Sequence, residues 1–415
     1  MMRYTKEGVG EAFVDIIGSI GNVTMDKFNE WTFLANYAHI EPTMHDPAKI
    51  DDKIQEVKKE IAAIQGREGM YLKGMLNAFE LFNRVMAGDQ VKYSDACAVM
   101  QQVNLRSLPM DTTYEAIAAR VSEKLGKLGY TGAVGEQIQA FLKATTLPAD
   151  QVTKTAANLV ERAKAATLKK VVVLPENDGI DAIDGVTGVH WSGFSRYLGN
   201  YRGDLRFNIE RPWTTPIFGN VLCHEAYPGH QTFYCHWDHL FQQGKLPLEG
   251  AYYTTAGNPT NCMFEGAPEV GLHFLGWDDY NENTPEITDE EKELFIVGRE
   301  IEDLQRMLQT QGCYLANEEG LGKEDVVQYM LSKGIYNRIE AENSYKYFTN
   351  PVGRYYYPSY YYGRWMIAGA YDRVPKEKRA EFFHMLYDFP HTNETFIKES
   401  ADLIGDPSFD PLANW

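Results

Sequence analysis

The chain has 415 residues, of which 44% are hydrophobic and 24% are charged, and its formal net charge is −18. These fractions are typical of folded proteins and exclude a disordered chain. The negative charge repels nucleic-acid phosphates and anionic membranes, and the sequence lacks the run of about 18 apolar residues that a membrane-spanning helix requires. We therefore expect a protein without nucleic-acid or membrane partners that accepts a neutral or cationic substrate; the oligomeric state stays open.

The first part of the chain has the pattern of successive amphipathic helices. Apolar residues recur at helical spacing over residues 51–64, 69–86 and 150–166, and Gly and Pro residues separate these segments. The pattern predicts an N-terminal helical lobe over residues 1–167.

The N-terminus and the cysteines bear on the cellular compartment. The first apolar stretch is interrupted by Glu11, Asp15 and several glycines, unlike the core of a signal peptide. The five cysteines are odd in number, widely spread and without a CxxC pair, which disfavours a disulfide framework or a cysteine-based zinc site. We expect a cytoplasmic protein.

The order changes after residue 167. Residues 171–174 form a short β-branched run, and the Gly-rich stretch 188–209 has alternating apolar residues at Leu205, Phe207 and Ile209, which predicts a small sheet. Helical patterns return from Thr214, with 289–310 the longest and 376–387 another. The predicted class is therefore mainly α (α+β), with a catalytic lobe over residues 168–415. In this lobe the small sheet borders a cleft, and its edge is suited to hydrogen-bond an extended peptide.

One stretch carries a recognisable chemistry. His224 is followed directly by Glu225, and a second histidine, His230, lies six residues after the first. Two neutral imidazoles can hold a zinc ion, and a neighbouring carboxylate can take a proton from its bound water and pass it to a leaving amine. On a regular helix this spacing would put the two histidines on different sides, but Pro228 and Gly229 favour a kinked or widened turn that brings them together. From the residues alone, a metal site and two unrelated histidines remain equally supported.

A resemblance favours the metal site. Residues 224–230, His-Glu-Ala-Tyr-Pro-Gly-His, resemble the H-E-x-x-P-G-H signature of domain-of-unknown-function family 885, whose members are classed as zinc metallopeptidases related to the zincins. The resemblance implies a helical zincin-like metallopeptidase fold, with Zn²⁺ as cofactor and a peptide or small amide as substrate. Phe264-Glu265-Gly266 is similar to the family's Glu-Gly-Trp segment, which implies Glu265 as the third ligand. Residues 360–363 are similar to its Tyr-x-x-Gly segment, so Tyr360 is the candidate hydrogen-bond donor to the oxyanion of the intermediate.

The sequence departs from the family at three positions. Ala267 replaces the tryptophan, Pro268 interrupts the helix expected there, and Gln231 stands where a further histidine is common. These departures concern catalysis and substrate preference more than metal binding.

Several other residues compete for roles at the site. Glu269, one helical turn after Glu265, either replaces it as ligand or hydrogen-bonds a ligand imidazole. We assign surface or packing roles to His236 and His239, packing at a sheet end to His190, and no specific role to Asn208 and Arg211. For any single tyrosine in the run 355–362, packing is the simplest interpretation.

The sequence therefore predicts a zinc-dependent hydrolase, with His224, His230 and Glu265 as ligands and with Glu225 and Tyr360 as catalytic residues. The alternative is a non-catalytic protein that keeps the peptidase fold and binds a metal or ligand in an aromatic cleft. A third possibility is that the two histidines are purely structural.

Overall fold

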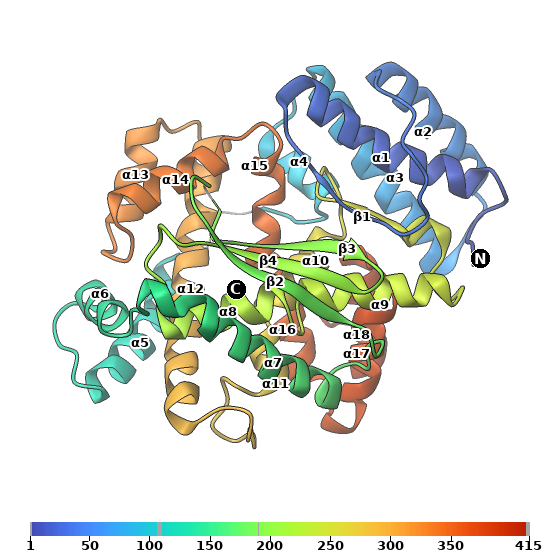
Figure 1. Ribbon diagram of the computed structural model, residues 1–415. Coiled ribbons are helices and arrows are strands. Elements are labelled where there is room, and N and C mark those ends of the chain that lie inside the picture. The colour runs from blue at the N-terminus through green and yellow to red at the C-terminus, as the bar shows by residue number, and fades with distance from the viewer. Residues whose placement is uncertain (1, 106–109, 190, 412–415) are drawn as a thin grey trace.

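The computed structural model describes residues 2–105, 110–189 and 191–411 and shows a mainly helical protein with two small sheets (Figure 1). The predicted mainly α (α+β) class is confirmed. Up to residue 170 the helices are α1 (Val9–Phe28), α2 (Pro47–Ile61), α3 (Gly66–Ala87), α4 (Tyr93–Met100), the π-helix η1 (Met110–Tyr114), α5 (Glu115–Lys127), α6 (Val134–Ala144), the 3-10 turn η2 (Ala149–Gln151) and α7 (Val152–Lys170).

The second part of the chain holds the remaining helices. In chain order these are α8 (Thr215–Glu225), α9 (His230–Gln242), η3 (Leu248–Gly250), α10 (Asn261–Glu269), α11 (Gly271–Leu275), α12 (Asp289–Asn317), α13 (Lys323–Leu331), α14 (Arg338–Phe348), α15 (Gly353–Tyr356), α16 (Pro358–Arg373), η4 (Lys376–Lys378), α17 (Arg379–Asp388) and α18 (Asn393–Ile404). The predicted helical segments correspond to α2, α3, α7 and α12, and the last predicted segment corresponds to η4 followed by α17.

The larger sheet lies directly before α8 in the chain. Its strands β2 (Gly179–Val186), β4 (Arg202–Asn208) and β3 (Gly193–Gly199) lie in that spatial order, with β2 parallel and β3 antiparallel to β4. Leu205 and Phe207 alternate on the buried side of β4 as predicted. A second, two-stranded sheet pairs β1 (Phe33–Asn36) with β5 (Tyr252–Thr254).

The strand prediction is wrong in several details: strands β1 and β5 were not predicted, and Ile209 lies after β4 and is 39% exposed. Residues 171–174 form no strand; they follow α7, and Val172 and Leu174 are buried while Val173 is exposed. The apolar run thus serves packing beneath the sheet rather than strand pairing. Strand β2 was missed because Asp181 and Asp184 interrupt its apolar pattern.

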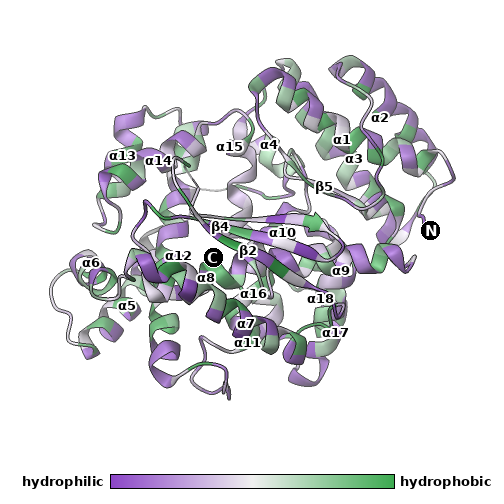
Figure 2. Ribbon diagram, viewed as in Figure 1, coloured by the Kyte–Doolittle hydropathy of each residue, from purple (hydrophilic) through white to green (hydrophobic). Residues whose placement is uncertain are grey.

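The apolar core joins distant parts of the chain. One cluster of buried side chains runs from Phe13 and Phe79 in the N-terminal helices to Phe233, Phe264 and Phe382 in the second half. The boundary between residues 1–167 and 168–415 stays a prediction. Figure 2 shows hydrophilic residues along every labelled helix, and within the described residues no helix is both long and apolar enough to cross a membrane.

A second apolar cluster fixes the position of α8. Phe207 of β4 and Phe295 of α12 both belong to it, together with Phe218 of α8. Where α8 crosses α12, a Cβ added at Gly219 would lie 2.2 Å from the Phe295 ring, and one at Gly298 would lie 2.7 Å from Pro216. Because these glycines allow close contact, α8 is held firmly between the sheet and α12, with its C-terminal end at the candidate site.

Candidate metal centre

The segment that contains both histidines is a turn between two helices. Helix α8 ends at Glu225 and α9 begins at His230, and the Tyr227–Pro228 peptide bond between them is cis. The kinked or widened turn predicted at Pro228 and Gly229 is thus a complete break between two helices. Gly229 permits the turn, because a Cβ at this position would lie 1.8 Å from the carbonyl oxygen of His224. The turn brings the two imidazole rings to a centroid distance of 4.7 Å.

The structure brings the three predicted ligands together. One side-chain nitrogen or oxygen atom from each of His224, His230 and Glu265 lies within 4.8 Å of the other two, and all three residues are buried. His224 Nε2 is 3.2 Å from Glu265 Oε2, and His230 Nε2 is 3.7 Å from Glu265 Oε1. Among the described residues this is the group of His, Cys, Asp and Glu side chains with the spacing of a metal site.

Helices α10 and α16 cross closely, and this crossing requires the glycines Gly266 and Gly363, which follow Glu265 and Tyr360 in the chain. A Cβ added at Gly266 of α10 would lie 2.2 Å from the backbone of Gly363, and one at Gly363 of α16 would lie 2.0 Å from the carbonyl oxygen of Cys262. Only glycine fits at both positions. Because the backbones nearly touch, Glu265 of α10 lies within hydrogen-bonding reach of Tyr356, which precedes α16.

Tyr356 is a site residue that the sequence analysis missed. Its hydroxyl donates a hydrogen bond to Glu265 Oε1, whereas Glu265 Oε2 is buried and faces His224 Nε2 at 3.2 Å. The signal was available, because Tyr356 lies four residues before Tyr360 and therefore on the same side of consecutive helical turns. Tyr356 leaves one carboxylate oxygen of Glu265 open for another ligand.

Glu269 takes the second of its two alternative roles. Its Oε1 atom lies 3.2 Å from His224 Nδ1, the nitrogen opposite the one that faces Glu265. Its carboxylate also receives hydrogen bonds of 2.6 and 3.1 Å from the guanidinium of Arg306. Although burial alone would raise the pKa of Glu269, Arg306 and His224 hold it well below its usual range. Glu269 is thus a buried carboxylate that orients the imidazole of His224.

The local charges favour a cation between these side chains. Burial lowers the pKa of His224, but Glu265 and Glu269 outweigh this effect and raise it to about 10. Burial and the neighbouring His224 hold the pKa of His230 well below its usual range. The site therefore stabilises one positive charge on the His224 side while His230 stays neutral.

Glu225 lies beside this cluster and faces a cavity of about 200 Å³. Its side chain packs against the first residue of β3, since a Cβ at Gly193 would lie 3.1 Å from the Glu225 carboxylate. Burial raises the pKa of Glu225 to about 7, although His224 opposes the shift. Trp191, Ser192 and Gly193 line the cavity, so the start of β3 forms one wall of the cleft, as predicted for the sheet.

Tyr360 lines the same cavity. Its ring stacks on His224 with a centroid distance of 6.1 Å, and the Arg306 guanidinium lies 4.7 Å from the Tyr360 ring centre. Arg306 was also missed; it lies four residues after Glu302 on α12, and both line the cavity. Charged residues at this spacing on one side of a largely buried helix were the available signal.

The remaining candidates are not among the three clustered ligands. His236 pairs with Asp388 at 2.7 Å, and His239 is close to Tyr201. The Asn208 amide donates to the carbonyl of Val189 and serves the strand connection. His190 is outside the described residues, and Arg211 lines the cavity.

None of the three residues that depart from the family pattern lines the cavity. Ala267 is fully buried in the apolar core, and Pro268 lies in the last turn of α10, after Glu265. Gln231 is buried and donates a hydrogen bond of 3.1 Å to Asp178, which also accepts one from Tyr227. Gln231 therefore holds the turn in place rather than facing the cluster.

The comparisons with known proteins show the fold only. The chain matches no protein-family model and no curated protein. It is similar to the structure of "the putative lipoprotein from Colwellia psychrerythraea", with a TM-score of 0.60 and 14% identity over 86% of this chain. It is also similar to "a putative lipoprotein of unknown function from Shewanella oneidensis", with a TM-score of 0.53 and 15% identity over 85% of this chain. The chain spans 66% of the first protein's length and 72% of the second's.

Proposed function

We propose that this protein is a zinc-dependent hydrolase of the metallopeptidase type, with His224, His230 and Glu265 as metal ligands. The observation that carries the proposal is the convergence of one donor atom from each of these three buried residues within 4.8 Å. The similarity of residues 224–230 to the H-E-x-x-P-G-H signature agrees with it.

The residues present fit a zinc ion. Two imidazoles and one carboxylate are the donor set of many catalytic zinc sites, and the Oε2 atom of Glu265, which Tyr356 does not bind, is buried 3.2 Å from His224 Nε2. The adjoining cavity provides access for water and substrate. A zinc ion in this set would supply a Lewis acid and lower the pKa of a water molecule.

Glu225 and Tyr360 are the proposed catalytic residues. Glu225 would take the proton of the attacking water and deliver it to the leaving amine, and a pKa of about 7 suits a group that must both accept and donate at neutral pH. Tyr360 would donate a hydrogen bond to the developing oxyanion. Arg306 packs against the Tyr360 ring and restricts its position.

The proposed substrate is a peptide or a related small amide. Two features support this class: the resemblance to metallopeptidases, and the position of β3 beside Glu225, where a strand edge can hydrogen-bond an extended chain. The same chemistry serves other acyl compounds, so the substrate class depends on these two features and not on the ligand set.

Metal content and turnover test the proposal. We expect about one zinc per chain in the untagged protein and none in a His224→Ala, His230→Ala double variant. Glu225→Gln should keep the metal and lower peptide turnover about 100- to 10,000-fold, while Glu290→Gln, at an exposed position on α12, should change neither. Loss of both metal and turnover in Glu225→Gln would contradict its assignment as general base.

The alternative, a non-catalytic binding protein, predicts a different result. It would retain peptides from a library without cleaving them, and a wild-type protein that takes up no zinc would favour it. Turnover of any library peptide that depends on Glu225 would exclude it.

We also propose a cytoplasmic location. All five cysteines are buried free thiols, which agrees with a reducing compartment. The two structural neighbours are described as lipoproteins, which points to the cell envelope instead. Fractionation of the source cells separates the two, because a cytoplasmic protein stays with the soluble fraction after the envelope is removed.

A further inference from the structure

A second cavity continues from the one at the candidate metal centre. It has a volume of about 370 Å³, and Arg211, Val221, Glu302 and Arg306 line both cavities. His224 and Glu225 line the first cavity only, so the second lies further from the candidate metal ligands. The second cavity is therefore within reach of a molecule that fills the first.

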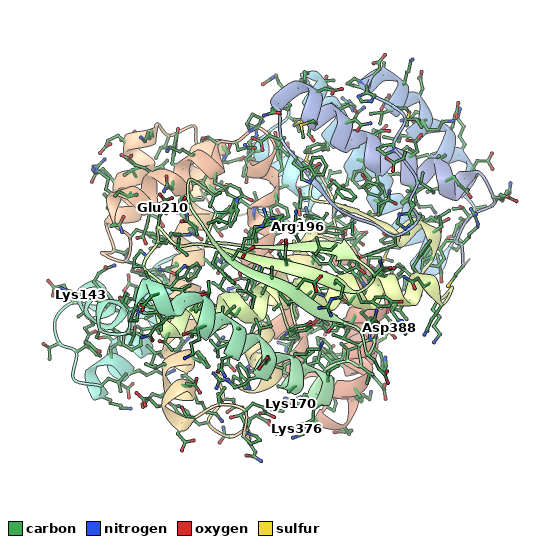
Figure 3. The ribbon with its side chains drawn as sticks, viewed as in Figure 1. Lys143, Lys170, Arg196, Glu210, Lys376 and Asp388 are labelled. Carbon is green, nitrogen blue, oxygen red and sulfur yellow. The ribbon has the colours of Figure 1, made fainter. Side chains whose placement is uncertain are left out.

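Two cations of the second cavity have no acidic partner. Arg211, in the connection between β4 and α8, and Lys143, near the end of α6, are exposed and line this cavity. Neither has a carboxylate within 4.0 Å among the described residues. Arg306, by contrast, is held by Glu269 at 2.6 Å. Figure 3 labels Lys143 and Glu210, the neighbour of Arg211 in the chain, on the same side of the molecule.

The residue before α8 adds one further donor to this cavity. Thr214, the residue that precedes α8, is only 6% exposed, and its hydroxyl has no hydrogen-bond partner among the described residues. Thr214 and Ile217 both line the cavity. The first turn of a helix carries a partial positive charge, which favours an anion.

Of the two acidic groups that line the cavity, the buried Glu302 opposes an anion only weakly. Burial raises the pKa of Glu302 to about 8, helped by the nearby Glu269, so Glu302 is mostly protonated at pH 7. The Glu340 carboxylate accepts a hydrogen bond of 3.1 Å from the Asn337 backbone at the start of α14.

We infer that the second cavity binds a carboxylate of the substrate through Arg211, with Lys143 and Thr214 as additional donors. The inference rests on the proposed function: the hydrolase would then act on peptides that carry a carboxylate near the bond to be cleaved. An arginine guanidinium can bind a carboxylate through two parallel hydrogen bonds. This geometry suits Arg211, which has no carboxylate partner among the described residues. The carboxylate belongs either to the peptide C-terminus or to an acidic side chain.

Binding to the full-length Glu225→Gln protein, supplied with zinc, tests this inference without turnover. The probes are N-acetyl-Ala-Ala-Ala, its C-terminal amide, and the amide N-acetyl-Ala-Glu-Ala-NH₂, measured by titration calorimetry. We expect the free acid to bind at least about tenfold more tightly than its amide, and Arg211→Ala to remove this preference. Lys143→Ala should reduce it less, and Arg338→Ala, at an exposed site that lines neither cavity, should leave it unchanged.

Each outcome decides the inference. Tight binding of the glutamate-containing amide, lost in Arg211→Ala, would assign the site to an acidic side chain; its absence would assign it to the C-terminus. Equal binding of free acid and amide, binding of neither, or a preference that survives Arg211→Ala would overturn the inference. If the inference failed but the wild type still cleaved acid and amide equally, the proposed hydrolase function would remain supported. If the binding preference depended on Arg211 but the wild type cleaved neither peptide, the carboxylate site would be supported and the hydrolase function would be refuted.

Discussion

The N-terminal helices and the candidate metal centre are stabilised in different ways. In α1 and α3, side chains such as Phe13, Ile17 and Phe79 are fully buried among other apolar groups. Charged pairs of this region, such as Lys58 with Glu80, are partly exposed. At the centre, by contrast, Glu265 and Glu269 are buried at 2% exposure, and Arg306 compensates Glu269.

The two regions therefore contribute to the free energy of folding in opposite ways. Burial of apolar surface is favourable at roughly 25 cal/mol per Å². Burial of ionic groups carries a desolvation penalty of several kcal/mol per ion, which partners offset only when the geometry is good. The N-terminal helices thus contribute stability, whereas the centre uses part of that stability to keep charged groups in place.

Phe79→Ala is expected to have the largest effect on stability. Removal of a fully buried phenylalanine ring leaves a cavity and should lower the free energy of unfolding by about 3–5 kcal/mol. The affinity for zinc should stay unchanged below the unfolding temperature, because Phe79 is not among the residues of the candidate site. Chemical denaturation and zinc titration check the two parts; weaker zinc binding in the folded variant would show that the regions are coupled.

Gly363→Ala should affect both stability and the site. The added Cβ would lie 2.0 Å from the Cys262 carbonyl oxygen, so α10 and α16 must move apart, at a cost of about 1–3 kcal/mol, and Glu265 must move with α10. We expect weaker zinc binding as well as a lower unfolding free energy.

Gly126→Ala is the matched control for this change. Gly126 lies in α5 at an exposed position, and a Cβ there meets nothing within 4 Å. Alanine should therefore stabilise the protein by about 0.5–1 kcal/mol and leave zinc binding alone. If Gly363→Ala and Gly126→Ala changed the unfolding free energy and the zinc affinity equally, the close crossing of α10 and α16 would not be important for the site.

Glu269→Gln should act on the metal and also lower stability, because the buried Arg306 loses the charge of its carboxylate partner. Loss of the carboxylate beside His224 Nδ1 should lower the zinc affinity about 10- to 100-fold. Competition with a zinc chelator measures this change. An affinity equal to that of the wild type would mean that Glu269 serves only to pair with Arg306.

Local sequence patterns were sufficient for several of the longer helices and for the candidate ligand types. The repeat of apolar residues predicted α2, α3, α7 and α12, because a helix that packs on one side shows this periodicity in any environment. His224, Glu225 and His230 were identified because these residue types in close succession suit one chemistry.

Other features depended on contacts between distant segments. Only the tertiary structure decided that α8 ends at Glu225, that Glu269 faces an imidazole nitrogen, and that Tyr356 binds Glu265. These contacts depend on the close crossing of α10 and α16 and on the placement of α12 against α8, and they join residues up to 91 positions apart. The sequence by itself determined which side chains were available for chemistry, while packing between helices decided which of them meet, because no local pattern encodes how two distant backbones approach.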